Sequence, residues 1–453
     1  MKKLTIIGGG SVRTPFFAYS LAKRASELNI SELCLFDRDP ARLEHIGALS
    51  SFVAGQKNPR LKISMETNVE RAIADTAYFV VSIREGGDHS RVVDEEIAQK
   101  FGVLGQETTG AGGLFMAARS IPPLINYYEK IRRLTPQAWI FNFTNPSGMV
   151  TQAMRTLGYE RVIGICDTPS STRKRIADAM SYDDKDFYLE FYGLNHLSWA
   201  HKALYRGKDV LEEILNNHAI IQKVGELAMF DPALLKLLGV IPNEYLYYYY
   251  YQDKVIENIK RSSTSRGQVI EENNKALFAD LADPSLHNNK EEMLRIYLRH
   301  MFVRESSYMK IETAKQISTE SETLDIGGHE GYAGIAMNCI EALEGKETQA
   351  VLSVPNENSI HGFANDDVVE ITCNVDNRGP HPVYVGTVNN ETFSIMKAVK
   401  TYERLGIEAI TKGRKEYAIR ALMAHPLIGS FNTAKGLIDE FILKQGSYAG
   451  HWT

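Results

Sequence analysis

The sequence contains few cysteines, no long apolar run and no excess of basic residues. The cysteines lie far apart and form no Cys-x-x-Cys pair: Cys34, Cys166, Cys339 and Cys373. This usage argues against a disulfide-rich secreted fold and fits free thiols in a reducing cytoplasm, where we expect the protein to be located. No apolar stretch reaches the roughly 18 residues of a membrane span, so we expect no transmembrane helix. A net charge of −5 argues against a nucleic-acid-binding protein.

What the sequence does contain is a strong alternation of apolar runs and helical segments in its first part. The chain has 453 residues, of which 44% are hydrophobic, enough for more than one domain. A helix is predicted at residues 14–28, and strands at residues 3–7, 32–36, 77–83, 139–143 and 162–166. This order predicts right-handed βαβ units with a parallel sheet. We therefore predict an α/β fold with a doubly wound, Rossmann-like domain over residues 1–170.

The remaining residues, 171–453, show a different pattern and predict a second, α+β domain. We assign to it part of the substrate and metal site and the contacts of a homo-oligomer. Its predicted elements are strands at 188–205, charge-rich helices at 210–320, antiparallel strands at 368–388 and two closing helices at 391–446.

A glycine-rich turn follows the first predicted strand. Its residues are Gly8, Gly9, Gly10 and Ser11. Glycines let the backbone approach a pyrophosphate, and the following helix offers free N–H groups at its N-terminus. Asp37, which ends the second strand, would bind the ribose hydroxyls of NAD, although Arg38 leaves NADP open. Since Arg13 replaces the third glycine of the usual motif, an ordinary tight turn is the alternative.

A second candidate site combines Cys166, at the end of the strand at 162–166, with His196. A thiolate and an imidazole with open positions could hold a divalent transition metal. A buried core cysteine is the alternative for Cys166.

Further polar segments could line a ligand site. Asn142 and Asn145 flank a strand end before a proline turn, and residues 105–113 form a glycine-rich loop. Local hydrogen bonding within a turn is the alternative for the asparagines. Tyr245 precedes a run of tyrosines that we expect mostly to pack on helix faces. Arginines can bind phosphate in a bidentate manner, and the candidates are Arg84, Arg91 and Arg266.

Taken together, these segments resemble glycoside hydrolase family 4, which includes NAD- and manganese-dependent 6-phospho-β-glucosidases and 6-phospho-α-glucosidases. The similarity extends over nearly the whole chain, in order. It is carried by Ile-Gly-Gly-Gly-Ser at 7–11, Gly-Gln-Glu-Thr-Thr-Gly-Ala-Gly-Gly-Leu-Phe at 105–115, Asn-Phe-Thr-Asn-Pro-Ser-Gly at 142–148, Gly-Ile-Cys-Asp at 164–167, Gly-Leu-Asn-His-Leu-Ser-Trp at 193–199 and Pro-Asn-Glu-Tyr-Leu at 242–246.

The resemblance implies a role for individual residues. Cys166 and His196 would be the metal ligands and Tyr245 the catalytic base. Asp167 falls where the α-specific members carry a proton donor, whereas many β-specific members have asparagine. The other motifs are closer to the β-specific members, so we expect 6-phospho-β-glucosides as substrates, with the α-anomers as the alternative. The implied substrate contacts are Arg91 and Asn145, with Arg266 near the sugar phosphate.

The resemblance also implies a redox-neutral reaction. NAD⁺ would take hydride from C3 of the sugar, which makes the C2 proton acidic, and a divalent metal such as Mn²⁺ would stabilise the negative charge that develops. Tyr245 would remove the C2 proton, and the glycosidic oxygen would leave by elimination. Water would then add to C1 and NADH would return its hydride. Phosphorylated disaccharides or aryl glucosides would be the substrates.

Three other interpretations remain open at this point. A simple NAD-dependent dehydrogenase would share the glycine turn but not the Cys166–His196 pair. A non-catalytic sensor would bind NAD or a sugar phosphate without needing Tyr245. A family member acting on unphosphorylated α-galactosides or uronides would not need Arg266. We expect a homodimer or homotetramer, without nucleic acid or membrane partners.

Overall fold

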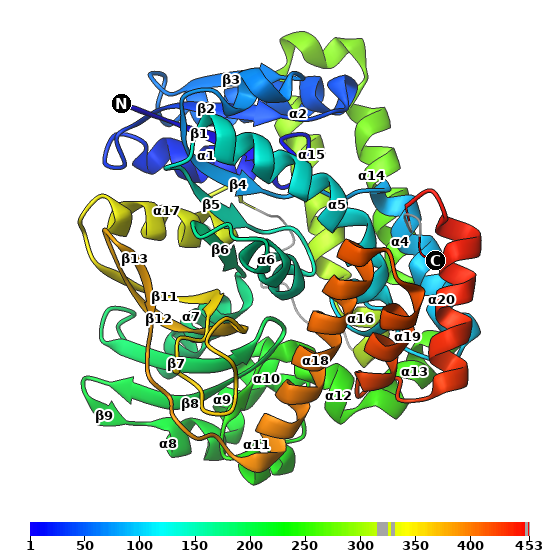
Figure 1. Ribbon diagram of the computed structural model, residues 1–453. Helices are drawn as coiled ribbons and strands as arrows, with labels where there is room; N and C mark the ends of the chain where they lie inside the picture. The colour runs from blue at the N-terminus through cyan, green and yellow to red at the C-terminus, as the bar shows by residue number, and fades with distance from the viewer. Residues whose placement is uncertain (315–324, 328–330, 449–451, 453) are drawn as a thin grey trace.

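The computed structural model describes residues 1–314, 325–327, 331–448 and 452, and in this part of the chain nine strands form one central sheet (Figure 1). Six parallel strands follow the spatial order β3-β2-β1-β4-β5-β6, which is the order of a doubly wound dinucleotide-binding fold. The predicted α/β architecture is confirmed. The strands are β1 (Lys2–Ile7), β2 (Ile30–Phe36), β3 (Lys62–Glu66), β4 (Thr76–Val81), β5 (Trp139–Asn142) and β6 (Val162–Ile165).

Helices connect these strands and cover the sheet on both faces, which explains why its central strands are continuous apolar runs (Figure 1). Helix α1 ends at Arg24, earlier than the sequence predicted. The helices of this half are α1 (Thr14–Arg24), α2 (Pro40–Gly55), α3 (Val69–Ile73), α4 (Gly87–Lys100), α5 (Gly110–Leu134), α6 (Ser147–Thr156) and α7 (Thr168–Met180).

Three strands from late in the chain extend the sheet beyond β6. They are β11 (Thr348–Pro355), β12 (Val368–Asp376) and β13 (Gly379–Pro382), and all of these pairings are antiparallel. The contact to the parallel part pairs Leu352 with Ile165. The antiparallel strands predicted at 368–388 therefore exist, but they belong to the central sheet, which is mixed rather than purely parallel.

A smaller antiparallel sheet lies beside the central one. It contains β7 (Phe187–Leu194), β8 (Leu197–Tyr205), β9 (Lys208–Asp209) and β10 (Ile241–Pro242). Strands β7 and β8 pair up to Leu194 and Leu197, so only Asn195 and His196 form the turn between them. The strands predicted at 188–205 are confirmed, and their hairpin turn carries one of the candidate metal ligands.

Helices make up most of the second half of the described chain. The C-terminal segment contains three helices, not two, because Gly413 in the left-handed conformation ends α18 (Asn390–Lys412) before α19 (Lys415–Ala424) begins. The remaining elements are α8 (Leu211–Asn216), α9 (His218–Lys223), α10 (Gly225–Ala228), α11 (Pro232–Leu238), η1 (Glu244–Leu246), α12 (Tyr247–Tyr250), α13 (Gln252–Arg261), α14 (Arg266–Leu281), η2 (Pro284–Asn288), α15 (Lys290–Ser306), α16 (Lys310–Thr313), α17 (Gly331–Leu343), α18 (Asn390–Lys412), α19 (Lys415–Ala424) and α20 (Phe431–Gln445).

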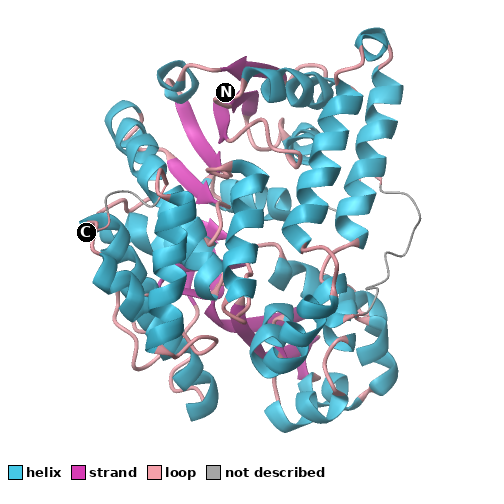
Figure 2. Ribbon diagram, turned by 90° about the vertical axis from the view of Figure 1, so that its right-hand side faces the viewer, coloured by secondary structure: helices cyan, strands magenta, loops and turns pink. Residues whose placement is uncertain are grey.

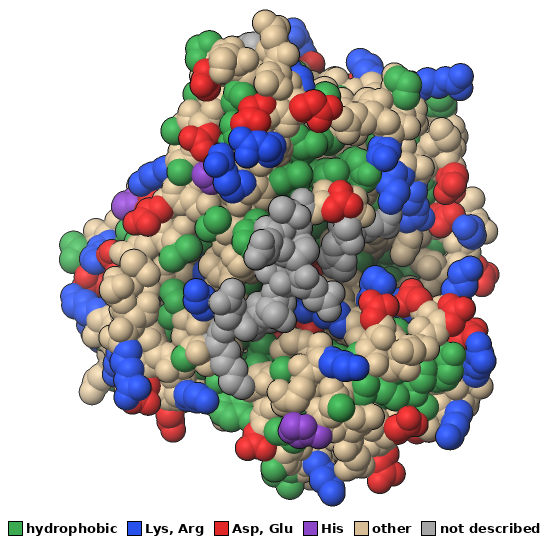
Figure 3. All heavy atoms as spheres, turned by 180° about the vertical axis from the view of Figure 1, so that it is seen from behind, with side chains coloured by type: hydrophobic (Ala, Val, Ile, Leu, Met, Phe, Trp, Pro, Cys, Tyr) green, Lys and Arg blue, Asp and Glu red, His purple; other side chains and the backbone are tan. Residues whose placement is uncertain are grey.

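The charge on one face of the molecule and the character of the described helices agree with what the amino-acid composition indicates. Figure 2 shows how helices surround the sheet, and none of those in the described residues is long and apolar enough to cross a membrane. On the face in Figure 3, basic and acidic side chains are interspersed, which matches the small net charge of −5.

Candidate active site

A cavity of about 710 Å³ opens at the carboxyl ends of the parallel strands. This edge is where doubly wound folds bind their ligands. The lining includes residues after β1, β2, β4, β5 and β6 and residues of α4, α14 and α15. The cavity brings together the predicted site residues with the exception of Gly9, namely Gly8, Gly10, Ser11, Asp37, Arg91, Asn145, Cys166, Asp167, His196, Tyr245 and Arg266.

The glycine turn is packed too tightly for side chains. Gly8 has a φ of +95°, and a Cβ there would lie 2.1 Å from the Ser82 carbonyl oxygen. A Cβ on Gly9 would lie 2.8 Å from the Leu35 Cα, because Gly9 faces strand β2 rather than the cavity. The N–H of Gly10 donates to Asp37 Oδ2 at 2.8 Å. Asp37 therefore fastens the turn, a role that the sequence did not predict, while its remaining lone pairs can still accept from a ribose.

Helix α1 begins directly after this turn. Arg13 occupies its N-cap position, and no side chain caps the first turn in the described residues. Free N–H groups and the positive end of the helix dipole are what a pyrophosphate requires. The turn, the open helix start and Asp37 therefore fit a dinucleotide.

His196 lies in the β7–β8 turn with a φ of +61°, an uncommon backbone conformation for a non-glycine residue. Its Nδ1 forms a hydrogen bond of 2.8 Å with the Thr108 hydroxyl, which belongs to the glycine-rich loop. This contact fixes the ring and leaves Nε2 as the atom available to a ligand. Burial lowers the pKa of His196 to about 3, so that the ring is neutral near pH 7, as a metal ligand must be.

Cys166 follows β6 and is 6% exposed. Burial raises the pKa of its thiol, and the nearby Glu370 raises it further. A divalent cation would supply the positive charge that this thiolate lacks. Among the described residues, no group of three or more His, Cys, Asp or Glu side chains is arranged to hold a metal. The donor set is thus one thiolate and one imidazole, which fits a transition metal that leaves positions open for a substrate.

Tyr245 stacks on His196, with ring centroids 3.7 Å apart and planes 6° from parallel. Asn243 caps the short helix η1 and accepts from the Tyr245 N–H at 3.0 Å. Burial raises the pKa of Tyr245 well above its ordinary value, and Glu244 adds to this effect. Tyr245 can therefore act as a base only when a cation lies close to its oxygen.

Glu370, on β12, connects these parts and was not predicted from the sequence. It accepts from Asn195 Nδ2 at 2.8 Å and from the Ser198 hydroxyl at 2.9 Å, so that one donor precedes His196 and the other follows it. Asn243 in turn donates to Ser198 at 3.3 Å. One buried carboxylate thus holds the turn that carries His196 and the start of the helix that carries Tyr245.

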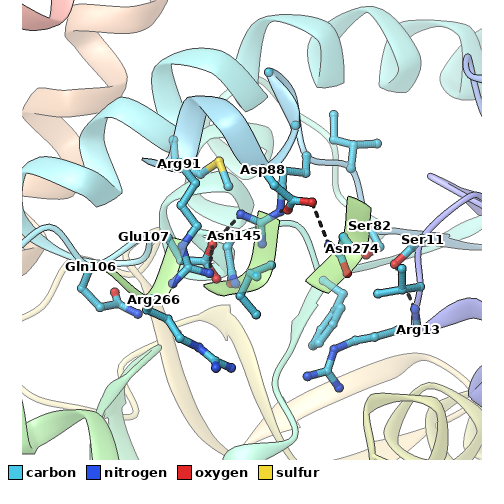
Figure 4. A pocket seen from close by; sticks show the side chains of 18 of the residues that line it. Ser11, Arg13, Ser82, Asp88, Arg91, Gln106, Glu107, Asn145, Arg266 and Asn274 are labelled. Atoms are coloured by element: carbon cyan, nitrogen blue, oxygen red, sulfur yellow. Dashed lines mark hydrogen bonds and ion pairs between the residues drawn. The ribbon is translucent and has the colours of Figure 1, made fainter. Parts of the chain in front are cut away.

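Arginines and carboxylates alternate along the wall of the cavity. Figure 4 shows Arg91, Glu107 and Arg266 on one side and Ser11 and Arg13 on the other. Glu107 accepts from Arg84 at 2.6 Å and lies 3.3 Å from Arg91. Although burial opposes it, these two arginines hold the pKa of Glu107 well below its usual range.

Asp167 occupies the N-cap position of α7, yet its side chain forms no capping hydrogen bond in the described structure. Its carboxylate lines the cavity and acts electrostatically on both Arg13 and Tyr245. Asn145 lies near Arg91 and Glu107 in Figure 4.

Several residues in the cavity wall were missed by sequence reasoning. Arg304 and Tyr308 come from the end of α15 and the segment that follows, and Glu312 comes from α16. Tyr308 donates to Glu244 at 2.7 Å and hydrogen-bonds Tyr245. The only signal in the sequence was that residues 210–320 are helical and rich in charge, which does not indicate which charges face inward.

The chain is similar to known proteins over almost its entire length. Residues 3–182 match the family 4 glycosyl hydrolases, and residues 191–428 match the family 4 glycosyl hydrolase C-terminal domain. The 6-phospho-β-glucosidase BglT of Thermotoga maritima is 31% identical over 448 residues, which cover 98% of this chain and 99% of the relative. A maltose-6′-phosphate glucosidase of Fusobacterium mortiferum is 28% identical and covers 99% of both chains.

Solved structures give the same result. The Thermotoga maritima 6-phospho-β-glucosidase with manganese, NAD⁺ and glucose 6-phosphate superposes with a TM-score of 0.82 at 29% identity, covering 99% of each chain. A 6-phospho-α-glucosidase from gut microorganisms, in complex with NAD and Mn²⁺, gives a TM-score of 0.80 at 25% identity over 100% of both chains. On this agreement of sequence and fold, the chain belongs to glycosyl hydrolase family 4 and is an enzyme that cleaves glycosidic bonds.

Proposed function

We propose that this enzyme hydrolyses 6-phospho-β-glucosides, using NAD⁺ and a divalent metal such as Mn²⁺. The observation that supports this most strongly is the convergence of the glycine turn, Cys166, His196 and Tyr245 on one cavity. A dinucleotide, a cation and a base would thereby meet at a single reaction centre. When bound, NAD⁺ supplies reversible oxidation of the sugar, and the metal supplies a Lewis acid next to the carbon that loses a proton.

The residues of the chain carry out the remaining tasks. The N–H groups at the start of α1 bind the pyrophosphate. Cys166 and His196 would hold the cation, with His196 oriented by Thr108. Tyr245, stacked on His196, accepts the C2 proton. Asp167, whose side chain makes no capping bond, donates a proton to the leaving oxygen.

Two alternatives predict different products. A 6-phospho-α-glucosidase is supported by Asp167, and the relatives include α-specific enzymes. A simple NAD-dependent dehydrogenase would use the same glycine turn. It would not need a buried Cys166 that interacts electrostatically with Glu370 and Tyr245. The first alternative changes the anomer, whereas the second leaves NADH as a product.

One assay panel tests these possibilities. p-Nitrophenyl α- and β-glucosides, each with and without a 6-phosphate, are incubated with NAD⁺ and Mn²⁺ present or omitted. We expect nitrophenol release from the 6-phospho-β-glucoside only when NAD⁺ and Mn²⁺ are both available. Nitrophenol release from the 6-phospho-α-glucoside instead would identify the enzyme as a 6-phospho-α-glucosidase. NADH formed in proportion to substrate, without nitrophenol, would refute the glycosidase.

Some broader properties are part of the same proposal. A phosphorylated substrate and free thiols support a cytoplasmic location. We retain the division into a dinucleotide-binding domain, residues 1–170, and a substrate, metal and oligomerisation domain, residues 171–453. We also retain a homodimer or homotetramer, which sedimentation or light scattering can test.

A further inference from the structure

The arginines that line the cavity fall into two groups by their partners. Four of them form an ion pair with a carboxylate. These pairs are Arg13 with Glu305 at 3.2 Å, Arg38 with Glu85 at 2.6 Å, Arg84 with Glu107 at 2.6 Å and Arg91 with Glu95 at 2.9 Å. Their positive charge is thus already compensated by the protein before any ligand binds.

Arg42, Arg266 and Arg304 form the other group. Arg42 packs over the Phe278 ring, which leaves Arg266 and Arg304. Within residues 1–314, 325–327, 331–448 and 452, neither lies within ion-pair distance of a carboxylate. Arg266 donates to the Ser307 hydroxyl and, at 2.9 Å, to the backbone carbonyl oxygen of Arg304, so the two residues are neighbours. The Arg304 Nε is fully buried and has no hydrogen-bond partner in the described structure.

An uncompensated guanidinium in a buried wall costs free energy. The electrostatics agree with this view. Burial lowers the pKa of Arg304 to about 9, and Arg13, Arg84 and Arg266 contribute as well, although Glu305 opposes them. Burial and Arg91 lower the pKa of Arg266, although Glu312 and Glu305 oppose them. By contrast, although burial opposes it, Glu107 and Glu95 raise the pKa of Arg91.

We infer that Arg304 is the partner of Arg266 in binding the 6-phosphate of the substrate. A phosphate monoester carries a charge of about −1.5 to −2 at pH 7, which two guanidinium groups without an ion pair in the described residues would neutralise. Its oxygens accept well from the forked N–H groups of arginine. This assignment rests on the proposed function.

The dinucleotide is the other source of phosphate oxygens in this cavity. Arg304 also lies close enough to Arg13, at the glycine turn, for their charges to interact. Both the sugar phosphate and the dinucleotide would present a phosphate oxyanion to Arg304. If Arg304 binds the sugar phosphate, its replacement weakens glucose 6-phosphate binding; if it binds the dinucleotide, its replacement weakens NAD⁺ binding.

Isothermal titration calorimetry on the full-length protein with Mn²⁺ separates these sources. Three ligands are titrated: glucose 6-phosphate and glucose, each in the presence of NAD⁺, and then NAD⁺ alone. The variants are Arg304→Gln and Arg304→Lys, with Arg266→Gln as the reference for the phosphate site. Arg295→Gln is the matched control, since Arg295 lies on the same helix, is 65% exposed and pairs with Glu292.

Arg304→Gln is expected to weaken glucose 6-phosphate binding about 10- to 100-fold, the range for loss of a charge-assisted hydrogen bond, and to leave NAD⁺ affinity unchanged. Arg304→Lys should recover part of the loss because it keeps the charge. Arg295→Gln should change neither ligand. Thermal unfolding of each variant checks that the fold is intact, and if Arg304→Gln does not fold, Arg304→Lys still tests the bidentate contact, with an expected loss of several-fold.

Two results would overturn the inference. The first is unchanged glucose 6-phosphate affinity in folded Arg304 variants. The second is a loss confined to NAD⁺, which would assign Arg304 to the cofactor. If the wild-type protein prefers glucose 6-phosphate to glucose and the Arg304 variants lose that preference, but no 6-phospho-glucoside is hydrolysed, then the proposed function fails while the phosphate site stands.

Discussion

The protonation of three side chains at this site, His196, Cys166 and Tyr245, is compatible with a cation bound between them. The ring of His196 is neutral because it is buried, and Thr108 occupies its Nδ1. Cys166 and Tyr245 both have a pKa raised by burial. A cation would reverse the effect of burial on both groups at once, since a positive charge favours their deprotonated forms. Metal binding and activation of the base are therefore coupled at the level of single residues.

Replacement of Cys166 by serine tests the ligand role. We expect Cys166→Ser to weaken Mn²⁺ binding by at least about 100-fold, because losing a ligand costs more than losing an outer partner of one. Metal titration monitored by the electron paramagnetic resonance of Mn²⁺ measures this without relying on turnover. Cys339→Ser, at a buried position on α17, is the control. Normal Mn²⁺ affinity in Cys166→Ser would remove Cys166 from the site.

Replacement of Tyr245 by phenylalanine tests the base. The variant keeps the stacking on His196 but has no oxygen to accept a proton, so exchange of the C2 proton with D₂O should slow about 10²- to 10⁴-fold. Nuclear magnetic resonance of glucose 6-phosphate incubated with enzyme, NAD⁺ and Mn²⁺ measures the exchange. Tyr250→Phe serves as control, since the Tyr250 hydroxyl binds Trp199 Nε1 at 3.2 Å. Wild-type exchange in Tyr245→Phe would place the base elsewhere.

At the scale of elements, the hairpin formed by β7 and β8 positions the metal ligand. Its two-residue turn places His196 at a positive φ, which costs on the order of 1–3 kcal/mol and persists only where the surroundings hold it. The surrounding contacts come from distant parts of the chain: Thr108 before α5 and Glu370 on β12. Late strands that join the central sheet thereby stabilise a turn of the smaller sheet.

Glu370→Gln tests this dependence. Glu370 accepts from both Asn195 and Ser198, whereas the glutamine amide group would turn an N–H toward one of these donors. We expect Mn²⁺ affinity to fall about 10- to 100-fold, as for other outer-shell contacts, with a changed visible spectrum of the Co²⁺-substituted enzyme. Glu391→Gln, at an exposed position of α18, is the control. If the Co²⁺ spectrum and the Mn²⁺ affinity remain as in the wild type, Glu370 has no positioning role.

The sequence predicted those elements whose apolar pattern is strong. Five of the parallel strands are buried on both faces and were visible as apolar runs, but the edge strand β3 has no fully buried side chain and was missed. Strand β11 also escaped prediction, and the pairing of late strands with β6 depends on contacts between residues far apart in the chain. For the same reason, Glu370 and Arg304 could not be identified, whereas Cys166, His196 and Tyr245 lie in local motifs.

At the scale of the whole molecule, the cavity is closed by both halves of the chain, so its buried ionisable groups affect global stability. His425 is completely buried and contacts Thr109 at 2.9 Å, next to the loop that holds His196. Burial lowers the pKa of His425 to about 3, as it does for His196. Between pH 3 and the unfolded-state value of about 6.5, the unfolded chain binds more protons than the native one. The contribution to stability is thus lost as the pH falls through this range.

Urea unfolding of the metal-free protein between pH 7 and pH 4 measures this effect. Each of the two histidines should lower the free energy of unfolding by about 1.4 kcal/mol per pH unit once the pH is below about 6.5. In His425→Gln the pH dependence should be smaller by that amount, even if the variant is less stable overall. His218→Gln, at an exposed position, should keep the wild-type slope. An unchanged slope in His425→Gln would contradict the burial argument.

The fate of the hydrogen on C2 tests the account most directly. Wild-type enzyme with NAD⁺ and Mn²⁺ is allowed to hydrolyse a 6-phospho-β-glucoside in D₂O, and the glucose 6-phosphate formed is analysed by mass spectrometry while absorbance at 340 nm is followed. We predict one deuterium at C2 and no net accumulation of NADH. A product that retains its C2 hydrogen completely would contradict removal of the C2 proton and indicate direct displacement at C1.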